Sequence, residues 1–173
     1  MSTRIWIALG LLLVFGLVNI SIWQKEQLWS NGQTLLLPLA PVDPRSLMQG
    51  DYMILRYALA DQLAAHTGDA RHRLVLPTRG QLLVTVDQEQ VVQAAQLDQG
   101  QSLKTDQYRL QYRYHNGEIW LGAESFFFQE GHAQHYEQAR FGELRVDPKG
   151  HSILVGLRDQ DRQPIRKPDT NAL

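Results

Sequence analysis

The sequence contains no cysteine among its 173 residues. This absence excludes a disulfide framework, a thiolate zinc site and the attachment of a lipid to a cysteine. The chain also lacks a strong excess of charge, because 17 basic and 18 acidic residues give a net charge of −1. A nucleic-acid-binding surface would need a clear excess of basic residues, so we expect no nucleic-acid partner.

A complete set of catalytic residues is also missing. A serine nucleophile needs an activating base, and Ser46 has no lysine at a suitable distance, since only Lys104, Lys149 and Lys167 follow it. The sequence therefore favours a non-enzymatic protein without a cofactor. One hydrolytic alternative stays open and is based on two acidic residues described below.

The longest apolar run lies near the N-terminus, over residues 5–23. As a helix this run would be about 30 Å long, which matches the hydrocarbon core of a bilayer. Trp6 and Trp23 lie at its two ends, where aromatic side chains meet lipid headgroups. Residues 18–23 make a poor signal-peptide cleavage site. We therefore predict a retained single-pass anchor whose residues 5–23 contact the lipid bilayer.

Charges beside the apolar run predict its orientation. Arg4 lies on the short side, whereas Lys25 on the far side is offset by Glu26. The positive-inside rule then places the N-terminus in the cytoplasm and the bulk of the chain outside. We divide the chain into an anchor over residues 1–26, one domain over residues 27–160 and a polar tail over residues 161–173, which agrees with the usual size of a domain.

The most constrained stretch of the domain is residues 50–57. Gly50 and Asp51 make a tight bend, after which side chains alternate between two faces as in a half-buried strand. The architectural interpretation is a turn aspartate followed by an ordinary strand. A functional interpretation places Asp51 and Tyr57 at the lip of a cleft, with Arg45 as an ion-pair partner and Tyr52 beside them.

Gly50, Asp51, Tyr52, Leu55 and Tyr57 together fill every lettered position of the motif for which the GDYXXLXY family is named. The chain therefore resembles this family, whose members are small membrane-anchored bacterial proteins. The resemblance continues through the aromatic stretch before Gly131 and the final hairpin, so it touches most of the domain. Together with the orientation predicted from the charges, the resemblance implies an inner-membrane protein with a periplasmic domain. Such proteins are often encoded alongside multi-span membrane proteins, which implies an integral membrane partner.

Alternating or compact apolar stretches predict about eight strands, joined by short turns and short helices. The strands are expected over residues 34–39, 52–58, 80–87, 91–97, 108–114, 118–122, 125–128, 142–146 and 151–157, and helical turns over residues 24–32, 59–66 and 132–140. We expect residues 125–128 to form a buried strand. The order of the elements predicts a mainly β fold, an antiparallel sandwich or barrel behind one transmembrane helix.

The strand over residues 108–114 has the clearest alternation. Tyr108, Tyr112 and Tyr114 share one face, and Arg109 and Arg113 share the other. These tyrosines and Trp120 are expected in or near the core, with a sugar- or peptide-binding face as the alternative. The arginines are expected on the solvated side.

Glu130 and Asp51 are the two acids of the hydrolytic alternative, because each lies beside a glycine at a strand boundary, Gly131 and Gly50. If the two strand ends meet, the carboxylates could act as general acid and base. The protein would then be an envelope hydrolase or a carbohydrate-active protein. The competing interpretation is that Glu130 stabilises the N-terminus of a short helix that begins near His132.

His132 and His135 are weak candidates for a metal site. They lie three positions apart and would share one face of a helix. The zinc-binding pattern His-Glu-x-x-His is absent, however, and the spacing differs from it. A solvated helix face is the simpler interpretation, so we predict no metal ion.

Overall fold

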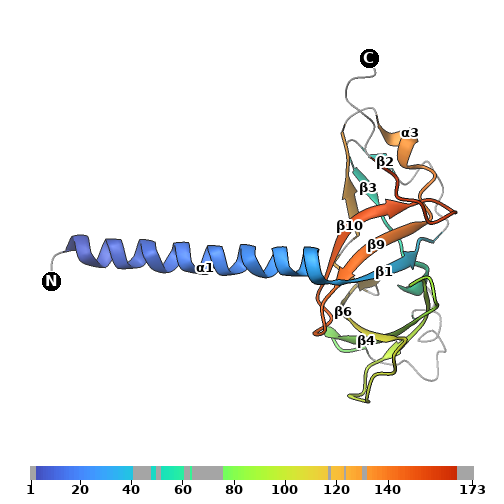
Figure 1. Ribbon diagram of the computed structural model, residues 1–173, viewed down its shortest axis with the longest axis horizontal. Coiled ribbons are helices and arrows are strands. Elements are labelled where there is room, and N and C mark those ends of the chain that lie inside the picture. The colour runs from blue at the N-terminus through green and yellow to red at the C-terminus, as the bar shows by residue number, and fades with distance from the viewer. Residues whose placement is uncertain are drawn as a thin grey trace.

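The computed structural model describes residues 3–40, 48–49, 52–60, 63, 76–116, 118–122, 124–129 and 132–166. Its longest element is the helix α1 (Thr3–Asn31), which projects from a β-rich domain (Figure 1). Residues 4–27 of this helix are exposed, and the helix is long and apolar enough to cross a membrane. The predicted apolar helix and its short extension are thus confirmed as one continuous element.

The described part of the domain contains three small sheets, in which every pairing is antiparallel. Their strand orders are β1-β9-β10, β2-β3-β8 and β5-β4-β6-β7. The strands are β1 (Gln33–Pro38), β2 (Met48–Gln49), β3 (Tyr52–Ile54), β4 (Arg79–Val86), β5 (Val92–Leu97), β6 (Gln107–His115), β7 (Glu118–Trp120), β8 (Ser125–Phe127), β9 (Phe141–Val146) and β10 (Ser152–Arg158). A single-turn helix, α3 (Ala133–Tyr136), precedes β9.

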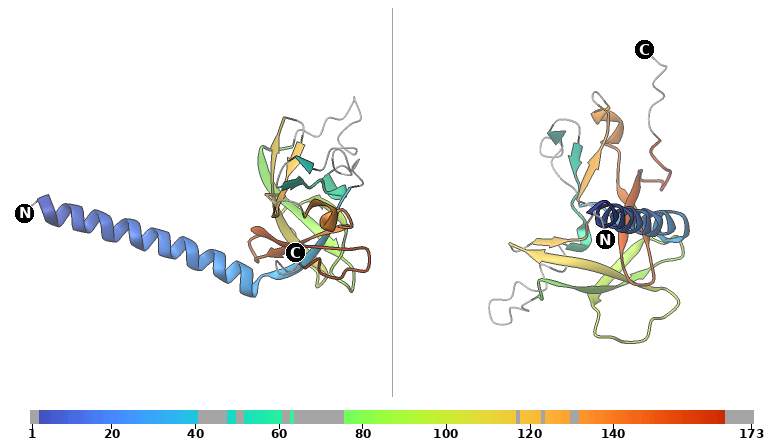
Figure 2. Two further views of the ribbon diagram at one scale, coloured as in Figure 1. Left: turned by 90° about the horizontal axis from the view of Figure 1, so that it is seen from above. Right: turned by 90° about the vertical axis from the view of Figure 1, so that its left-hand side faces the viewer.

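Backbone hydrogen bonds connect the sheets into a barrel-like wall. The N–H of Leu36 in β1 donates to the carbonyl of Gln90 at 2.8 Å, and the N–H of Gln111 in β6 donates to the carbonyl of Gly150 at 2.8 Å. The first bond joins β1 to the β4–β5 turn, and the second joins β6 to the β9–β10 turn. Figure 2 shows the strands curving around a common centre. The predicted mainly β, barrel-like fold is thus confirmed.

The core is formed by side chains that point inward from the sheets. Leu82 and Val84 of β4 lie on the same face as Leu110 and Tyr112 of β6, and all four are at most 3 % exposed. This burial is the expected result of the period-two pattern in residues 108–114. Tyr112 therefore belongs to the core, as the simpler interpretation predicts.

One type of turn occurs three times. In each copy an aspartate side chain accepts the N–H groups of the residues two and four positions later, at 2.8–2.9 Å. The three aspartates are Asp87, Asp147 and Asp159. The residue three positions after each aspartate has a positive φ, which is 63° for Gln90, 83° for Gly150 and 61° for Arg162. Each aspartate thus satisfies backbone donors that the flanking chain leaves unpaired.

The stability of the fold depends on pH through aspartates whose pKa values are lowered, which are Asp87, Asp98 and Asp147. The backbone N–H of Val91 holds the pKa of Asp87 below its usual value, and the hydrogen bond from Arg109 does the same for Asp98. An unfolded aspartate has a pKa of about 3.9. Because the folded pKa values are lower, the carboxylates stabilise the fold above about pH 4, and this stabilisation is lost as the pH falls through the folded values.

We therefore expect the melting temperature to fall steeply below about pH 4. The Asp87→Asn variant should lose part of that dependence, because its side chain cannot titrate. Circular dichroism melts of the full-length protein in detergent at several pH values would measure this. The control is Asp106→Asn, because Asp106 is exposed and its carboxylate has no hydrogen bond to the described residues. Equal acid profiles for Asp87→Asn and the unmodified protein would contradict the prediction.

Two predicted elements differ from the structure. The motif strand ends at Ile54 rather than at residue 58, because the chain then changes its partner. The N–H of Leu55 still donates to the carbonyl of Glu124 in register with β8, whereas Arg56 accepts from Ala40 and Tyr57 bridges Leu39 beyond β1. The predicted helix over residues 132–140 is only α3, because Arg140 already takes part in strand pairing through bonds to Leu39 and Arg158. The predicted helix over residues 59–66 lies mostly outside the described residues.

The strand predicted over residues 125–128 is confirmed as β8, but the prediction that it is buried is wrong. Phe127 is 74 % exposed, whereas Phe126 points inward and packs against Tyr136. The cause is the position of β8 at the edge of its sheet, next to β3 alone. A run of three phenylalanines has no alternation, so the sequence does not show which ring faces water.

Candidate functional site

Most of the residues predicted to form a site lie outside the described part of the chain. These are Arg45, Gly50, Asp51, Glu130 and Gly131. The proposed pairing of Asp51 with Glu130 therefore stays a prediction. Tyr52, Tyr57, His132 and His135 are described, and they lie in different surroundings.

The second half of the motif alternates between core and surface. Met53, Leu55 and Tyr57 are 2–3 % exposed, whereas Ile54 is 43 % exposed and Tyr52 is half-buried. This confirms the alternation predicted after the Gly50–Asp51 bend. Tyr57 lies in the core, and a role for it in binding stays a prediction.

The ring of Tyr57 is packed closely against Gly142 of β9. A Cβ atom on Gly142 of β9 would lie 3.1 Å from Cε1 of Tyr57, so the missing side chain of Gly142 makes room for the phenol. Burial raises the pKa of Tyr57 above its ordinary value, and the negative charge of Glu124 raises it further. The phenol therefore stays protonated at neutral pH and cannot act there as a base.

Glu124 is an acidic residue that the sequence analysis missed. Its backbone carbonyl accepts the N–H of Leu55 at 2.8 Å, which places it beside the motif. Its carboxylate accepts the N–H of Leu121 and the N–H of Gly122, the latter at 2.8 Å. These bonds hold Glu124 as a turn residue. The sequence signal was weak, because glutamate favours such turns less than aspartate does.

Tyr52 and the aromatic residues of β8 form a separate cluster. The ring of Tyr52 lies 5.7 Å from that of Phe127, its cross-strand neighbour. On the other face, Phe126 and Phe128 lie 5.1 and 5.3 Å from Tyr136. Such pairs add stability beyond burial alone. The cluster attaches α3 to the sheet that carries the motif.

His132 and His135 do not meet at a common centre with other ligands in the described structure. Nε2 of His135 lies 2.6 Å from the carbonyl oxygen of Arg166, and its ring packs edge-on against Tyr136. His132 is half-buried at the start of α3. Within the described ranges, no group of three or more histidine, aspartate or glutamate side chains could hold a metal ion.

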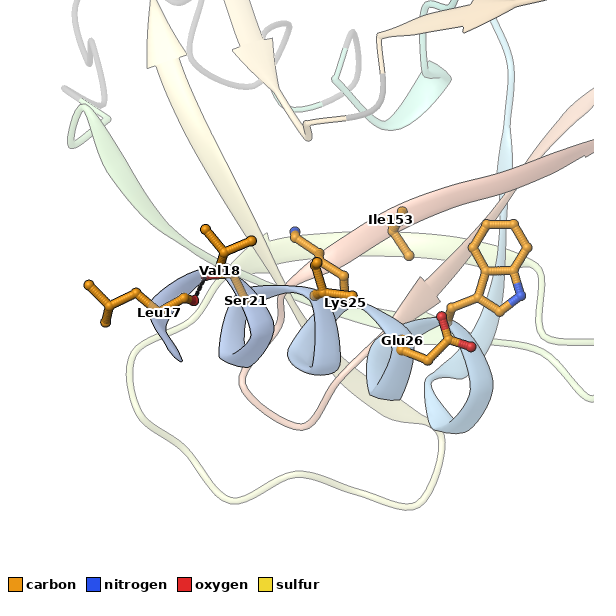
Figure 3. Close-up of a pocket in the computed structure, with 8 residues that line it drawn as sticks. Leu17, Val18, Ser21, Lys25, Glu26 and Ile153 are labelled. Carbon is orange, nitrogen blue, oxygen red and sulfur yellow. Dashed lines mark hydrogen bonds between the residues drawn. The ribbon is translucent and has the colours of Figure 1, made fainter. Parts of the chain in front are cut away.

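Two grooves lie beside α1. The first, which we call the apolar groove, has a volume of about 500 Å³ and runs between the helix and Ile153 of β10 (Figure 3). Its lining residues are Leu17, Val18, Ser21, Ile22, Lys25, Glu26, Trp29 and Ile153. The hydroxyl of Ser21 donates to the carbonyl of Leu17 at 2.9 Å, so this polar group is satisfied within the helix.

The second groove, which we call the basic groove, has a volume of about 740 Å³. Its lining includes Lys25, Arg79, Gln81, Arg113, Trp120 and His151. The helix, the sheet β5-β4-β6-β7 and the start of β10 all contribute to it. Arg113 is exposed, as its sequence pattern predicts, but nothing in the sequence indicates that Arg79 and Lys25 lie near it. The pairing register places Arg79 opposite Arg113, and the position of α1 beside the sheet adds Lys25.

The fold and these grooves define a class of protein, a barrel-like β domain carried directly on one helix that is long and apolar enough to cross a membrane. The GDYXXLXY protein family matches residues 14–157, and the chain belongs to this family. The match includes half of the helix and nearly all of the domain. Comparisons with curated proteins and with solved structures gave no match.

Proposed function

We propose that this protein is a membrane-anchored accessory subunit of the bacterial inner membrane, with its domain in the periplasm. In this proposal it binds an integral membrane protein through the apolar groove. The observation that carries the proposal is an apolar surface that continues from the helix onto the domain. The family resemblance supports the kind of partner, because related proteins are encoded alongside multi-span membrane proteins.

The helix is joined to the domain without a linker. The N–H of Gly32 donates to the carbonyl of Leu28 at 3.0 Å, and Nη1 of Arg145 in β9 donates to the carbonyl of Gly32 at 3.1 Å. Leu28 is buried at 7 % exposure. A Cβ atom on Gly32 would lie 3.0 Å from Cβ of Arg145, so the chain passes very close to β9. This joint fixes the direction of the helix relative to the domain.

The apolar groove extends past the apolar run. Val18 and Ile22 are 48 % and 60 % exposed within the run, and Trp29 is still 55 % exposed six positions after Trp23. Lipid tails can cover the part within the hydrocarbon core but not Trp29. An exposed apolar surface that continues above the hydrocarbon is typical of a protein contact. A transmembrane helix with a short extramembrane end would cover both parts.

Photocrosslinking in native membranes tests this partner. We expect a photoreactive benzoylphenylalanine in place of Val18 to form one adduct with an integral membrane protein. The control replaces Ile20 instead, because two residues turn a helix by about 200° and this position lies away from the groove at a similar depth. Equal adducts from both positions, or only adducts between two copies of this chain, would contradict the proposal.

The proposed orientation has a separate test, which uses the absence of native cysteine. A cysteine at exposed Gln134 should react in intact spheroplasts with a maleimide that does not cross the inner membrane. A cysteine at position 2 should react only after lysis, because we place the N-terminus in the cytoplasm. The reverse pattern would show that the domain is cytoplasmic.

A further inference from the structure

Three side chains cross the basic groove in one line. Arg79 of β4 lies directly opposite Arg113 of β6, and Arg113 lies directly opposite Trp120 of β7. Cross-strand neighbours project from the same face of a sheet with Cβ atoms about 5 Å apart. Two arginines in this arrangement repel each other, which is unfavourable unless an anion lies between them. All three side chains are exposed, and Trp120 is 44 % exposed.

These charges are not balanced within the described structure. Arg79, Arg113 and Lys25 form no ion pair or hydrogen bond through their side chains with the described residues. The neighbouring Arg109 shows the contrast, because its Nε lies 2.7 Å from Oδ2 of Asp98. The same sheet thus neutralises one arginine and leaves two adjacent ones available.

The remaining charged residues of the groove are already bound. Glu124 also lines it, but its carboxylate accepts the N–H groups of Leu121 and Gly122. Nδ1 of His151 lies 2.8 Å from Oδ2 of Asp147. Neutral N–H donors do not cancel the charge of Glu124, so the groove holds one negative charge against the three positive charges of its lysine and two arginines. Its net charge is therefore positive. Two guanidinium groups beside an ammonium group suit a phosphate, because arginine binds phosphate oxygens through two parallel hydrogen bonds.

The position of the groove indicates where the phosphate would come from. Lys25 lies two positions after Trp23, at the end of the apolar run. In the view along α1 from its N-terminus, β6 and β7 lie beside the helix on the face turned toward the viewer (Figure 2, right). If the run spans a bilayer, this face meets the headgroup layer, where tryptophan side chains such as Trp120 are favoured.

We propose that the basic groove binds the phosphate of an anionic membrane lipid, with Arg79 and Arg113 as the phosphate ligands. Trp120 lies along the glycerol end of the headgroup, and Lys25 supplies a further positive charge. This inference rests on the membrane anchoring in the proposed function. It adds a ligand class and a site that do not depend on the integral membrane partner.

The test is native mass spectrometry of the full-length protein in detergent micelles, titrated with phosphatidylglycerol or phosphatidylcholine. We expect one retained phosphatidylglycerol per protein and weaker retention of phosphatidylcholine. Each surface arginine contributes about fivefold to the affinity for an anionic lipid, so the double variant Arg79→Gln/Arg113→Gln should bind about 25-fold more weakly. The matched control Arg56→Gln/Lys104→Gln removes two exposed charges outside the groove and should bind as the unmodified protein does.

The outcomes separate this inference from the anchoring. If both double variants lose the same affinity for phosphatidylglycerol, the groove is not the binding site. If the protein retains both lipids equally, the groove does not select an anionic phosphate. If soluble glycerol phosphate displaces phosphatidylglycerol as well as the lipid itself does, the ligand is a soluble phosphate ester and not a lipid. Extraction of native membranes with alkaline carbonate tests the anchoring by itself, because a spanning protein stays in the membrane. A protein that washes off would overturn the proposed function and the lipid source together.

Discussion

Replacement of Tyr57 by alanine is expected to lower the free energy of unfolding by about 3–5 kcal/mol, the range for removal of a large buried side chain. Tyr57 is 3 % exposed, and its ring fills the space beside Gly142. Its backbone forms a bridge with Leu39, so neighbouring segments depend on its position. Chemical unfolding of the full-length protein in mild detergent, followed by circular dichroism of the strands, would measure the change.

The matched control is Tyr52→Ala, which removes the same side chain from the opposite face of the motif. Tyr52 is half-buried and packs mainly against the exposed Phe127, so we expect a loss of only about 1 kcal/mol. A loss at Tyr52 as large as that at Tyr57 would show that the alternation between faces does not determine stability. If Tyr57→Ala leaves the free energy of unfolding unchanged, the side chain of Tyr57 does not contribute to the stability of the core.

The Gly150→Ala variant should lose about 2–4 kcal/mol of stability for two reasons. Gly150 has a φ of 83°, a conformation that costs an L-residue about 1–2 kcal/mol. A Cβ atom would also lie 3.2 Å from the backbone carbonyl of Arg109, which cannot move without disturbing β6. The carbonyl of Gly150 accepts the N–H of Gln111, so the strain would reach the contact that joins two sheets.

Gly100→Ala separates the two reasons. Gly100 has nearly the same φ, 82°, but a Cβ atom there has no neighbour within 4 Å in the described structure. This variant should therefore show the conformational cost alone, about 1–2 kcal/mol. If both glycine variants lose the same stability, the close approach of Gly150 to Arg109 has no energetic effect. Unfolding in the same detergent would give both values.

The sequence predicted the elements whose signals are local. The strands β4, β5, β6, β9 and β10 lie within one or two residues of the predicted ranges, because alternation is read directly from neighbouring positions. The exposed helix was equally predictable, since a nearly continuous apolar run of nineteen residues is typical of a membrane-spanning helix. Ends of elements were less predictable. Tyr57 and Arg140 pair with distant residues that the local sequence does not contain, and these pairings determine where β3 ends and β9 begins.

The residues of the basic groove could not be predicted from the sequence either, because they come from distant parts of the chain. Nothing near Arg79 in the sequence indicates that Arg113 lies opposite it, because a register shift of one residue would place the two on different faces. Glu124 was missed for a related reason, since its hydrogen-bond partner Leu55 lies in a distant part of the sequence. The motif acids Asp51 and Glu130 were the easier residues to notice, and their arrangement is still a prediction.

Because α1 enters β1 through Gly32 alone, the domain cannot swing on a flexible tether. A tether of many residues would let it sample a wide volume, with a low effective concentration at any one point. With α1 in a bilayer, the short joint instead keeps the domain at one height, and encounters occur by lateral diffusion in two dimensions. Molecules in the same membrane then meet the domain repeatedly and in one orientation, whereas a soluble molecule must first reach the bilayer surface.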